Sequence, residues 1–150
     1  MIATMIDTVV RRADDADVHR IFDILRELAS VSEFTPRAVK ETHLANNVAA
    51  LLVNRDCAFF LAEREGRTVG ILVVLRSADL LSGAPLVSQV CWYVSPEHRN
   101  GVGLALLAEA EAWAASCGAP LEMTAPTEAF AQVYWRRGYA MKYQTFERRA

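Results

Sequence analysis

The 150-residue sequence predicts a mixed α/β domain, in which a mostly antiparallel central sheet carries helices on both faces. Two observations lead to this fold class. Apolar residues recur at helical spacing over 18–28 and 44–52, and short runs of strand-forming residues follow over 57–75. Further on, a strand, a helix and a strand succeed one another over 86–125, an order that permits a parallel pair.

The first part of the chain is predicted to be one strand followed by two helices. The strand covers residues 6–11, and Asp14 or Asp15 can cap the first helix by accepting a bond from an unpaired N–H of its first turn. The second helix is predicted to begin with Thr35 as its cap. Pro36 then takes the first helical position, where no N–H is missed.

The remainder contains most of the predicted sheet. Gly66 can supply the tight turn of a hairpin between strands over 57–64 and 68–75. After a loop over 77–85, strands and helices alternate: a strand over 86–94, a helix over 101–118, a strand over 120–125, a helix over 128–137 and a strand over 139–148. The predicted order is therefore β-α-α-β-β-β-α-β-α-β.

The composition predicts a single globular domain over residues 1–150, since 53% of the residues are hydrophobic and 23% are charged. A net charge of -2 gives no sign of a positively charged surface that would bind a polyanion, so nucleic acid is not an expected partner. The sequence shows no secretory signal and no apolar run of membrane-span length, which predicts a cytoplasmic protein. Cys57, Cys91 and Cys117 lie in apolar stretches without metal-ligand spacing, which favours reduced, buried thiols and no metal site.

The segment VSPEHRNGVGLALL, residues 94–107, places two glycines at the start of an apolar helix. A helix N-terminus has unpaired N–H groups and the positive end of the dipole, and glycine lets a phosphate approach the backbone. Gly101 and Gly103 fit this use, and His98 and Arg99 add side chains that can contact phosphate. A tight turn without a ligand is the alternative. Neither the dinucleotide fingerprint nor the P-loop pattern fits the segment.

Three segments together resemble the GNAT family of N-acetyltransferases. YVSPEHRNGVGLALL is similar to the family's loop for the pyrophosphate of coenzyme A, VYWRRGY (133–139) to its Tyr-x-x-x-Gly-Phe segment, and LAEREGRTVGIL to its Ala-Glu-x-x-Gly-x-x-Val-Gly hairpin. The order of elements is also similar, so the resemblance covers nearly the whole chain. The family's first basic loop position falls on His98 or Arg99, depending on where the count starts, and Thr127 stands where members often carry Asn.

The resemblance implies acetyl-CoA as co-substrate, without a metal, and a primary amine of a small molecule or protein as acceptor. In the family, backbone N–H groups of the strand before the loop hold the acetyl carbonyl and pantetheine. Carried onto this sequence, the cofactor-binding residues are Trp92, Tyr93, Val94, His98, Arg99, Asn100, Gly101, Val102, Gly103 and Leu104.

Tyr134 matches the family's general acid, because a phenol is protonated at neutral pH and can donate to the departing thiolate. Its alternative role is that of a packing aromatic residue. The base is less clearly marked. Glu122 is an acidic residue in the middle of a predicted strand and could take the proton of the amine, or it could be a structural carboxylate. His43 and Glu33 are the other candidates, and for both a solvated surface position is the alternative.

Two other functions compete with the acetyltransferase. A non-catalytic CoA-binding or regulatory domain would keep the same fold, and a nucleotide-binding α/β domain would bind phosphate without preferring CoA. The presence of Tyr134 and of the loop glycines favours the enzyme. The sequence leaves open which amine is the acceptor and whether the protein forms a homodimer.

Overall fold

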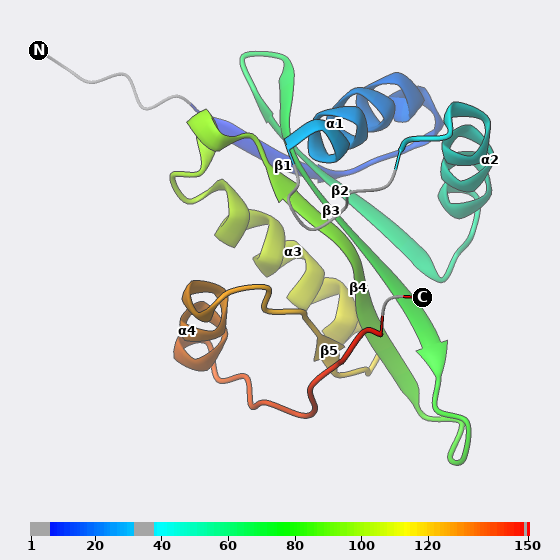
Figure 1. Ribbon diagram of the computed structural model, residues 1–150, viewed down its shortest axis with the longest axis vertical. Coiled ribbons are helices and arrows are strands. Elements are labelled where there is room, and N and C mark those ends of the chain that lie inside the picture. The colour runs from blue at the N-terminus through cyan, green and yellow to red at the C-terminus, as the bar shows by residue number, and fades with distance from the viewer. Residues whose placement is uncertain (1–6, 32–37, 149) are drawn as a thin grey trace, which may run out of the picture.

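Among the residues that the structure describes, five strands form one open sheet whose spatial order follows the chain, β1-β2-β3-β4-β5 (Figure 1). The computed structural model describes residues 7–31, 38–148 and 150. The strands are β1 (Thr8–Arg12), β2 (Cys57–Arg64), β3 (Arg67–Ala78), β4 (Pro85–Val94) and β5 (Leu121–Glu122). The helices are α1 (Val18–Val31), α2 (Glu41–Leu52), α3 (Val102–Ser116) and α4 (Glu128–Arg136), with short 3-10 turns η1 (Asp15–Asp17) and η2 (Pro96–His98).

The first four strands are antiparallel neighbours, and β5 joins β4 in parallel. The β2–β3 hairpin closes through two residues, because Arg64 pairs with Arg67. Glu65 and Gly66 both have positive φ, 51° and 74°, as the type I′ turn of a two-residue hairpin requires. This confirms the predicted role of Gly66.

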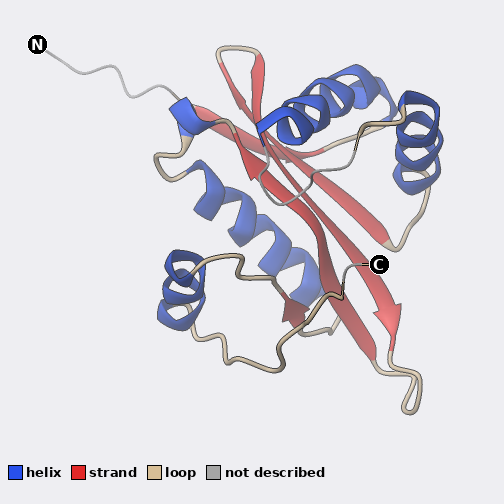
Figure 2. Ribbon diagram, in the orientation of Figure 1, coloured by secondary structure: helices blue, strands red, loops and turns tan. Residues whose placement is uncertain are grey.

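The two faces of the sheet bury separate cores, because alternate side chains of a strand point to opposite faces. On β2, Ala58, Phe60 and Ala62 belong to the core under α3, whereas Phe59 and Leu61 belong to the core under α1 and α2. Figure 2 shows α1 and α2 on one side of the sheet and α3 on the other. The prediction of helices on both faces is confirmed.

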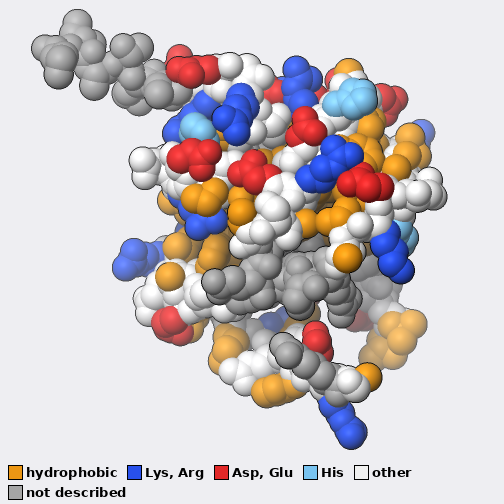
Figure 3. Space-filling model, turned by 45° about the horizontal axis from the view of Figure 1, so that its top comes forward, with side chains coloured by type: hydrophobic (Ala, Val, Ile, Leu, Met, Phe, Trp, Pro, Cys, Tyr) orange, Lys and Arg blue, Asp and Glu red, His pale blue; other side chains and the backbone are white. Residues whose placement is uncertain are grey.

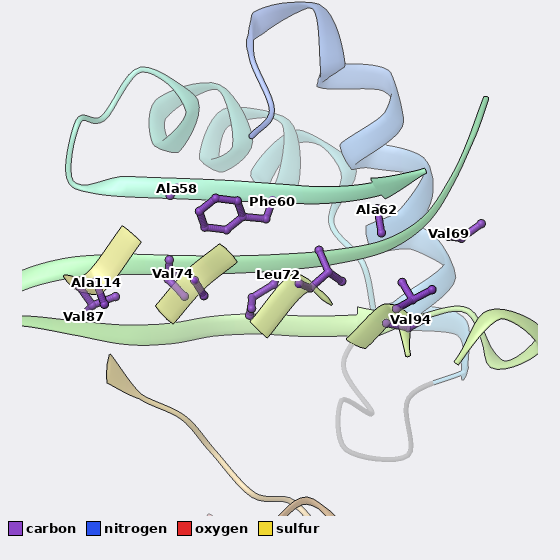
Figure 4. Packing of buried hydrophobic residues seen from close by; sticks show 12 residues of the cluster. Ala58, Phe60, Ala62, Val69, Leu72, Val74, Val87, Val94 and Ala114 are labelled. Atoms are coloured by element: carbon purple, nitrogen blue, oxygen red, sulfur yellow. The ribbon is translucent and has the colours of Figure 1, made fainter. Parts of the chain in front are cut away.

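Small residues of α3 allow this helix to lie close to the sheet. Ala110, Ala114 and Leu106 of α3 are buried in the same hydrophobic core as Leu72 and Val74 of β3. Figure 4 shows side chains of this core on β2, β3 and β4, with Ala114 close to Val87. Full burial of a side chain such as Leu72 stabilises a fold by about 1.5–3 kcal/mol, so this core fixes α3 and the loop that leads into it.

The cap predicted before the first helix is present, whereas α2 begins later than predicted. Asp14, one of the two predicted caps, accepts a bond from the N–H of Ala16 at 2.9 Å. The predicted start of the second helix at Thr35 and Pro36 lies outside the described residues. Residues 38–40 are not helical, and α2 begins at Glu41.

The loop predicted over 77–85 is shorter than expected. β3 continues to Ala78 and β4 begins at Pro85, and these two residues pair with each other. The strand pairing therefore extends into a stretch whose small and polar residues predicted a loop.

The C-terminal strand predicted over 139–148 is wrong, because this segment is irregular in the structure. Pairing of β5 is limited to Leu121 and Glu122, so the sheet offers the segment no long edge. Side chains hold it instead: the Tyr139 hydroxyl donates to Glu111 at 3.0 Å, and Tyr143 donates to Glu122 at 2.8 Å. The predicted strand over 120–125 is likewise reduced to two residues.

The surface carries charges of both signs. On the face seen in Figure 3, Lys and Arg side chains are interspersed with Asp and Glu and do not form a single-sign patch. Within the part of the chain that the structure describes, no helix has the length and apolar character needed to cross a membrane.

Candidate active site

The strands β4 and β5 separate after two residue pairs. Val87 pairs with Leu121 and Ser88 with Glu122, and the N–H of Val87 donates to the carbonyl of Pro120 at 3.0 Å. Beyond Ser88 the described ladder between the two strands ends, although β4 continues to Val94. We call the space between the diverging strands the fork.

A bulge in β4 lies at the start of the fork. Gln89 pairs with Val74 and Cys91 with Val73, so Val90 is an extra residue without a partner on β3. Such a bulge bends the strand and changes which face the following side chains occupy. Here it puts Trp92 on the α3 face, the face that Val87 also occupies.

Backbone N–H groups of β4 point into the fork. The N–H of Ser95 donates to the carbonyl of Val69 on β3 at 2.9 Å. Because N–H groups alternate in direction along a strand, those of Trp92 and Val94 point away from β3. These donors are available to a ligand lying along the edge of β4.

The strand leads directly to the N-terminus of α3. Gly101 is the cap residue of this helix, with φ of 82°, and no side chain caps the helix. The first-turn N–H groups of Val102, Gly103 and Leu104 have no partner within a helix. An added Cβ at Gly101 would meet no atom of the described residues within 4 Å, so the described part of the chain leaves the space beside this turn open to a ligand.

Basic side chains surround the turn between β4 and α3. Arg99 donates from Nε to the carbonyl of Val94 at 3.1 Å, which places its guanidinium beside the end of the strand. His98 is half-buried and Asn100 is exposed. Arg64, which the sequence did not single out, donates to the carbonyl of Asn100 at 3.5 Å.

Trp92 joins the loop to α4. Its indole lies against Gly103, where an added Cβ would come within 3.3 Å of the ring. The same indole also contacts two aromatic rings of α4. It meets Phe130 edge-on, with ring centroids 5.5 Å apart, and its centroid lies 6.2 Å from that of Tyr134. The close approach of the indole therefore favours glycine at position 103. This packing constraint could not be recognised from the loop motif alone.

Tyr134 lies beside the fork and is only 6% exposed. Its hydroxyl donates to the carbonyl of Thr124 at 2.9 Å, and its ring packs on Tyr139. Burial raises the pKa of this phenol above its ordinary value, so the group keeps its proton at neutral pH. It could therefore donate a proton to a nearby thiolate.

Glu122 occupies the last paired position of β5, at the base of the fork. Its neighbours Leu121 and Met123 pack on the α3 face, so its side chain points to the opposite face. There it forms an ion pair with Lys142 and accepts from Tyr143. The hydrogen bond from Lys142 and, to a lesser extent, that from Tyr143 lower the pKa of this carboxyl.

Tyr93 is separated from the other predicted cofactor residues because its side chain faces α1. Its hydroxyl donates to Glu27 of α1 at 3.1 Å, and Ser95 donates to the same oxygen at 2.6 Å. Burial is the main cause that raises the pKa of Tyr93, to about 12. Glu27 also lines a cleft of about 400 Å³ between α1 and the β2–β3 turn. The only sequence feature that pointed to the contact of Glu27 with Tyr93 and Ser95 was the position of Glu27 beside the apolar stripe of α1.

The remaining sequence candidates lie elsewhere. His43 is exposed on α2 and contacts Asn47 at 2.9 Å, and Glu33 lies outside the described residues. The three cysteines are free; Cys57 is buried, whereas Cys91 and Cys117 are half-buried. Among the described residues, His, Cys, Asp and Glu side chains form no group of three that could hold a metal ion.

A sheet that opens beside an uncapped helix N-terminus is therefore the central feature of the candidate site. The sequence model of the Acetyltransferase (GNAT) family matches residues 18–139. The chain therefore belongs to the GNAT family. A search of curated proteins found no match.

Solved structures show the same fold at low sequence identity. A ribosomal-protein-alanine N-acetyltransferase from Brucella melitensis biovar Abortus 2308 is 19% identical, with a TM-score of 0.75 over 96% of this chain and 98% of that one. The aminoglycoside N-acetyltransferase AAC(6')-Iy, in complex with CoA, is 16% identical, with a TM-score of 0.77 over 100% and 99%. A transcriptional regulator from Bacillus halodurans C-125 is 14% identical, with a TM-score of 0.78 over 96% and 100%.

Proposed function

We propose that this protein transfers an acetyl group from acetyl-CoA to a primary amine. The observation that carries the proposal is the fork, which brings N–H groups of β4 into line with the open N-terminus of α3. A thioester carbonyl needs hydrogen-bond donors, and a pyrophosphate needs a positive helix end and space beside a glycine. The fork offers both along one continuous edge.

The cofactor would lie along β4, with its thioester near the N–H of Trp92. The N–H of Val94 would hold the pantetheine, and the turn at Gly101 would hold the pyrophosphate with the first N–H groups of α3. Arg99 lies beside this turn and adds positive charge, and the neighbouring His98 adds a side chain that can contact phosphate. The side chain of Tyr93 points away towards α1, so only the backbone of this residue could take part.

The reaction forms a bond between the amine nitrogen and the acetyl carbon, and breaks the bond from that carbon to sulfur. The amine loses a proton and the thiolate gains one. We assign the protonation of the thiolate to Tyr134, whose ring packs on Trp92 on the α3 face. Its hydroxyl proton, which is donated to the Thr124 carbonyl in this structure, would leave that carbonyl and pass to the sulfur. Glu122 is the candidate base on the other face, so acid and base would flank the fork from opposite sides.

The acceptor is proposed only as a primary amine of a small molecule or protein. The solved neighbours include enzymes named for a ribosomal protein and for aminoglycosides, and both of these acceptors carry amines. A cytoplasmic location, expected from the sequence, would supply acetyl-CoA to the enzyme.

The decisive experiment measures CoA release from acetyl-CoA over a panel of polyamines, aminoglycosides and peptides with free N-termini. We expect amine-dependent release with at least one acceptor class. In parallel, a thermal-shift series compares acetyl-CoA with ATP and NAD. A ligand at 100 times its dissociation constant stabilises a fold by about 2.7 kcal/mol, so acetyl-CoA alone should raise the melting temperature.

A CoA-binding regulatory domain is the second candidate, because one structural neighbour is named a transcriptional regulator. Stabilisation by acetyl-CoA without release of CoA over the whole panel would favour that function. Equal stabilisation by ATP or NAD would contradict both candidates and point to a general nucleotide-binding domain.

A further inference from the structure

Gln89 bridges the fork immediately beyond the last pair of β4 and β5. Its side-chain oxygen accepts the N–H of Thr124 at 3.0 Å, two residues further along the chain than the end of the β5 ladder. A side chain thus replaces the next backbone bond of the ladder. Gln89 also directly precedes the bulged Val90, so it is the last residue of β4 before the register against β3 shifts.

Thr124 is held from two sides at once. Its N–H donates to Gln89, and its carbonyl accepts the hydroxyl of Tyr134 at 2.9 Å. Residues 123–127 form no helix or strand, so this backbone has no ladder of its own to fix its orientation. The two bonds form a chain that runs from β4, across the fork, to the phenol.

We propose that Gln89 is a positioning residue, which sets the place of the Tyr134 hydroxyl by fixing the backbone of Thr124. The inference rests on the proposed acetyl transfer, in which that hydroxyl donates the proton. Without the bond from Gln89, the Thr124 carbonyl can rotate and take the hydroxyl with it. A small displacement of a catalytic group lowers turnover more than it lowers binding.

The test replaces Gln89 by Leu, which keeps most of the volume but has no acceptor, and by Glu, which keeps the oxygens. Gln132→Leu is the matched control, because Gln132 is an exposed residue on α4. Gln89→Leu should lower kcat by roughly 10-fold while KM for acetyl-CoA changes little, and Gln89→Glu should restore most of kcat. Gln132→Leu should leave both constants unchanged.

Combination with Tyr134→Phe separates positioning from a general loss of structure. If Gln89 acts through the hydroxyl, Gln89→Leu should have little further effect once that hydroxyl is absent. An equal loss of kcat in both backgrounds would overturn the proposal. An unchanged kcat in Gln89→Leu would also overturn it.

A readout without turnover distinguishes this inference from the proposed function. Amide hydrogen exchange at Thr124 should accelerate in Gln89→Leu and remain slow in Gln89→Glu and Gln132→Leu. If the unmodified protein transfers no acetyl group to any acceptor, the proposed function is wrong. The role of Gln89 as a positioning residue for catalysis is then wrong as well. Unaltered exchange at Thr124 in Gln89→Leu would reject the bridge itself, whatever the activity.

Discussion

The hydroxyl of Tyr134 is a single group whose loss tests the chemistry directly. Tyr134→Phe keeps the ring that packs on Trp92 and Tyr139 but removes the proton donor. Since general acids contribute about 10²–10⁴-fold, turnover should fall at least ~10-fold while the affinity for acetyl-CoA stays nearly constant. Steady-state kinetics with an acceptor from the panel, together with calorimetric titration of acetyl-CoA, check this.

Tyr139→Phe is the matched control, because it removes a hydroxyl from the partner ring, where it binds Glu111. Its turnover should stay within about 2-fold of the unmodified enzyme, well below the usual effect of a lost general acid. If Tyr134→Phe loses affinity as strongly as turnover, the hydroxyl is a binding contact and not the acid.

The two loop glycines should respond differently to substitution. At Gly101 an Ala side chain has free space but an unfavourable positive φ, whereas at Gly103 a side chain meets the indole of Trp92. Gly103→Val overpacks this contact and should lower the free energy of unfolding by about 1–3 kcal/mol. Gly101→Ala should cost about 1 kcal/mol through backbone strain. Urea unfolding of both variants measures the two losses of unfolding free energy. An equal loss in both variants would mean that Trp92 moves aside without cost.

At the scale of elements, Glu27 fastens α1 to the end of β4. Its carboxylate accepts from the buried Tyr93 and Ser95 hydroxyl groups, which would lose their partner in Glu27→Ala. An unsatisfied buried polar group costs about 1–3 kcal/mol, and we expect a loss of this size in chemical denaturation. Glu109→Ala, on the exposed side of α3, should change stability by less than about 0.5 kcal/mol.

The turn between β1 and α1 gives the protein a specific acid sensitivity. Both oxygens of the buried Asp17 accept from Arg11 at 2.7 Å, and these bonds are the main cause that lowers the pKa of this carboxyl. A lowered pKa in the folded state stabilises the protein above the unfolded value near 3.9, and this contribution is lost as the pH falls further. Unfolding free energies should therefore decrease from about pH 5 downwards.

Asp17→Asn isolates this contribution. The variant should be less stable at pH 7 by about 2 kcal/mol, because the buried acceptor of two Arg11 hydrogen bonds loses its charge while Arg11 keeps its ion pair with Glu63. Its stability should also depend less on pH below 5. Asp15→Asn changes an exposed residue of the same turn and serves as the control. An unchanged pH dependence in Asp17→Asn would show that other carboxylates cause the acid sensitivity.

For the whole molecule, the sequence predicted what depends on local pattern. The periodicity of α1 and α3, the turn at Gly66 and the loop before α3 could all be recognised from neighbouring residues. The bridge from Gln89 to Thr124 could not, because it joins residues 35 positions apart whose meeting depends on where β4 and β5 diverge. The prediction of a C-terminal strand over 139–148 was wrong for a related reason. An alternating pattern forms a strand only where the edge of a sheet is free to pair with it. Here the segment does not pair, and the side chain of Phe146 remains 87% exposed.

The order of strands in the sheet, which repeats their order in the chain, also bears on how the molecule folds. The hairpins that join β2, β3 and β4 close short loops, whereas β5 can dock only after the long crossover through α3, at a greater entropic cost. Leu72→Ala, in β3, should therefore slow folding, and Leu121→Ala, in β5, should mainly accelerate unfolding. Stopped-flow chevron plots of the two variants test this order, and the reverse assignment of rates would refute it. If it holds, the fork assembles only after β2, β3 and β4 have paired, and the proposed cofactor site is incomplete in any folding intermediate that consists of these three strands alone.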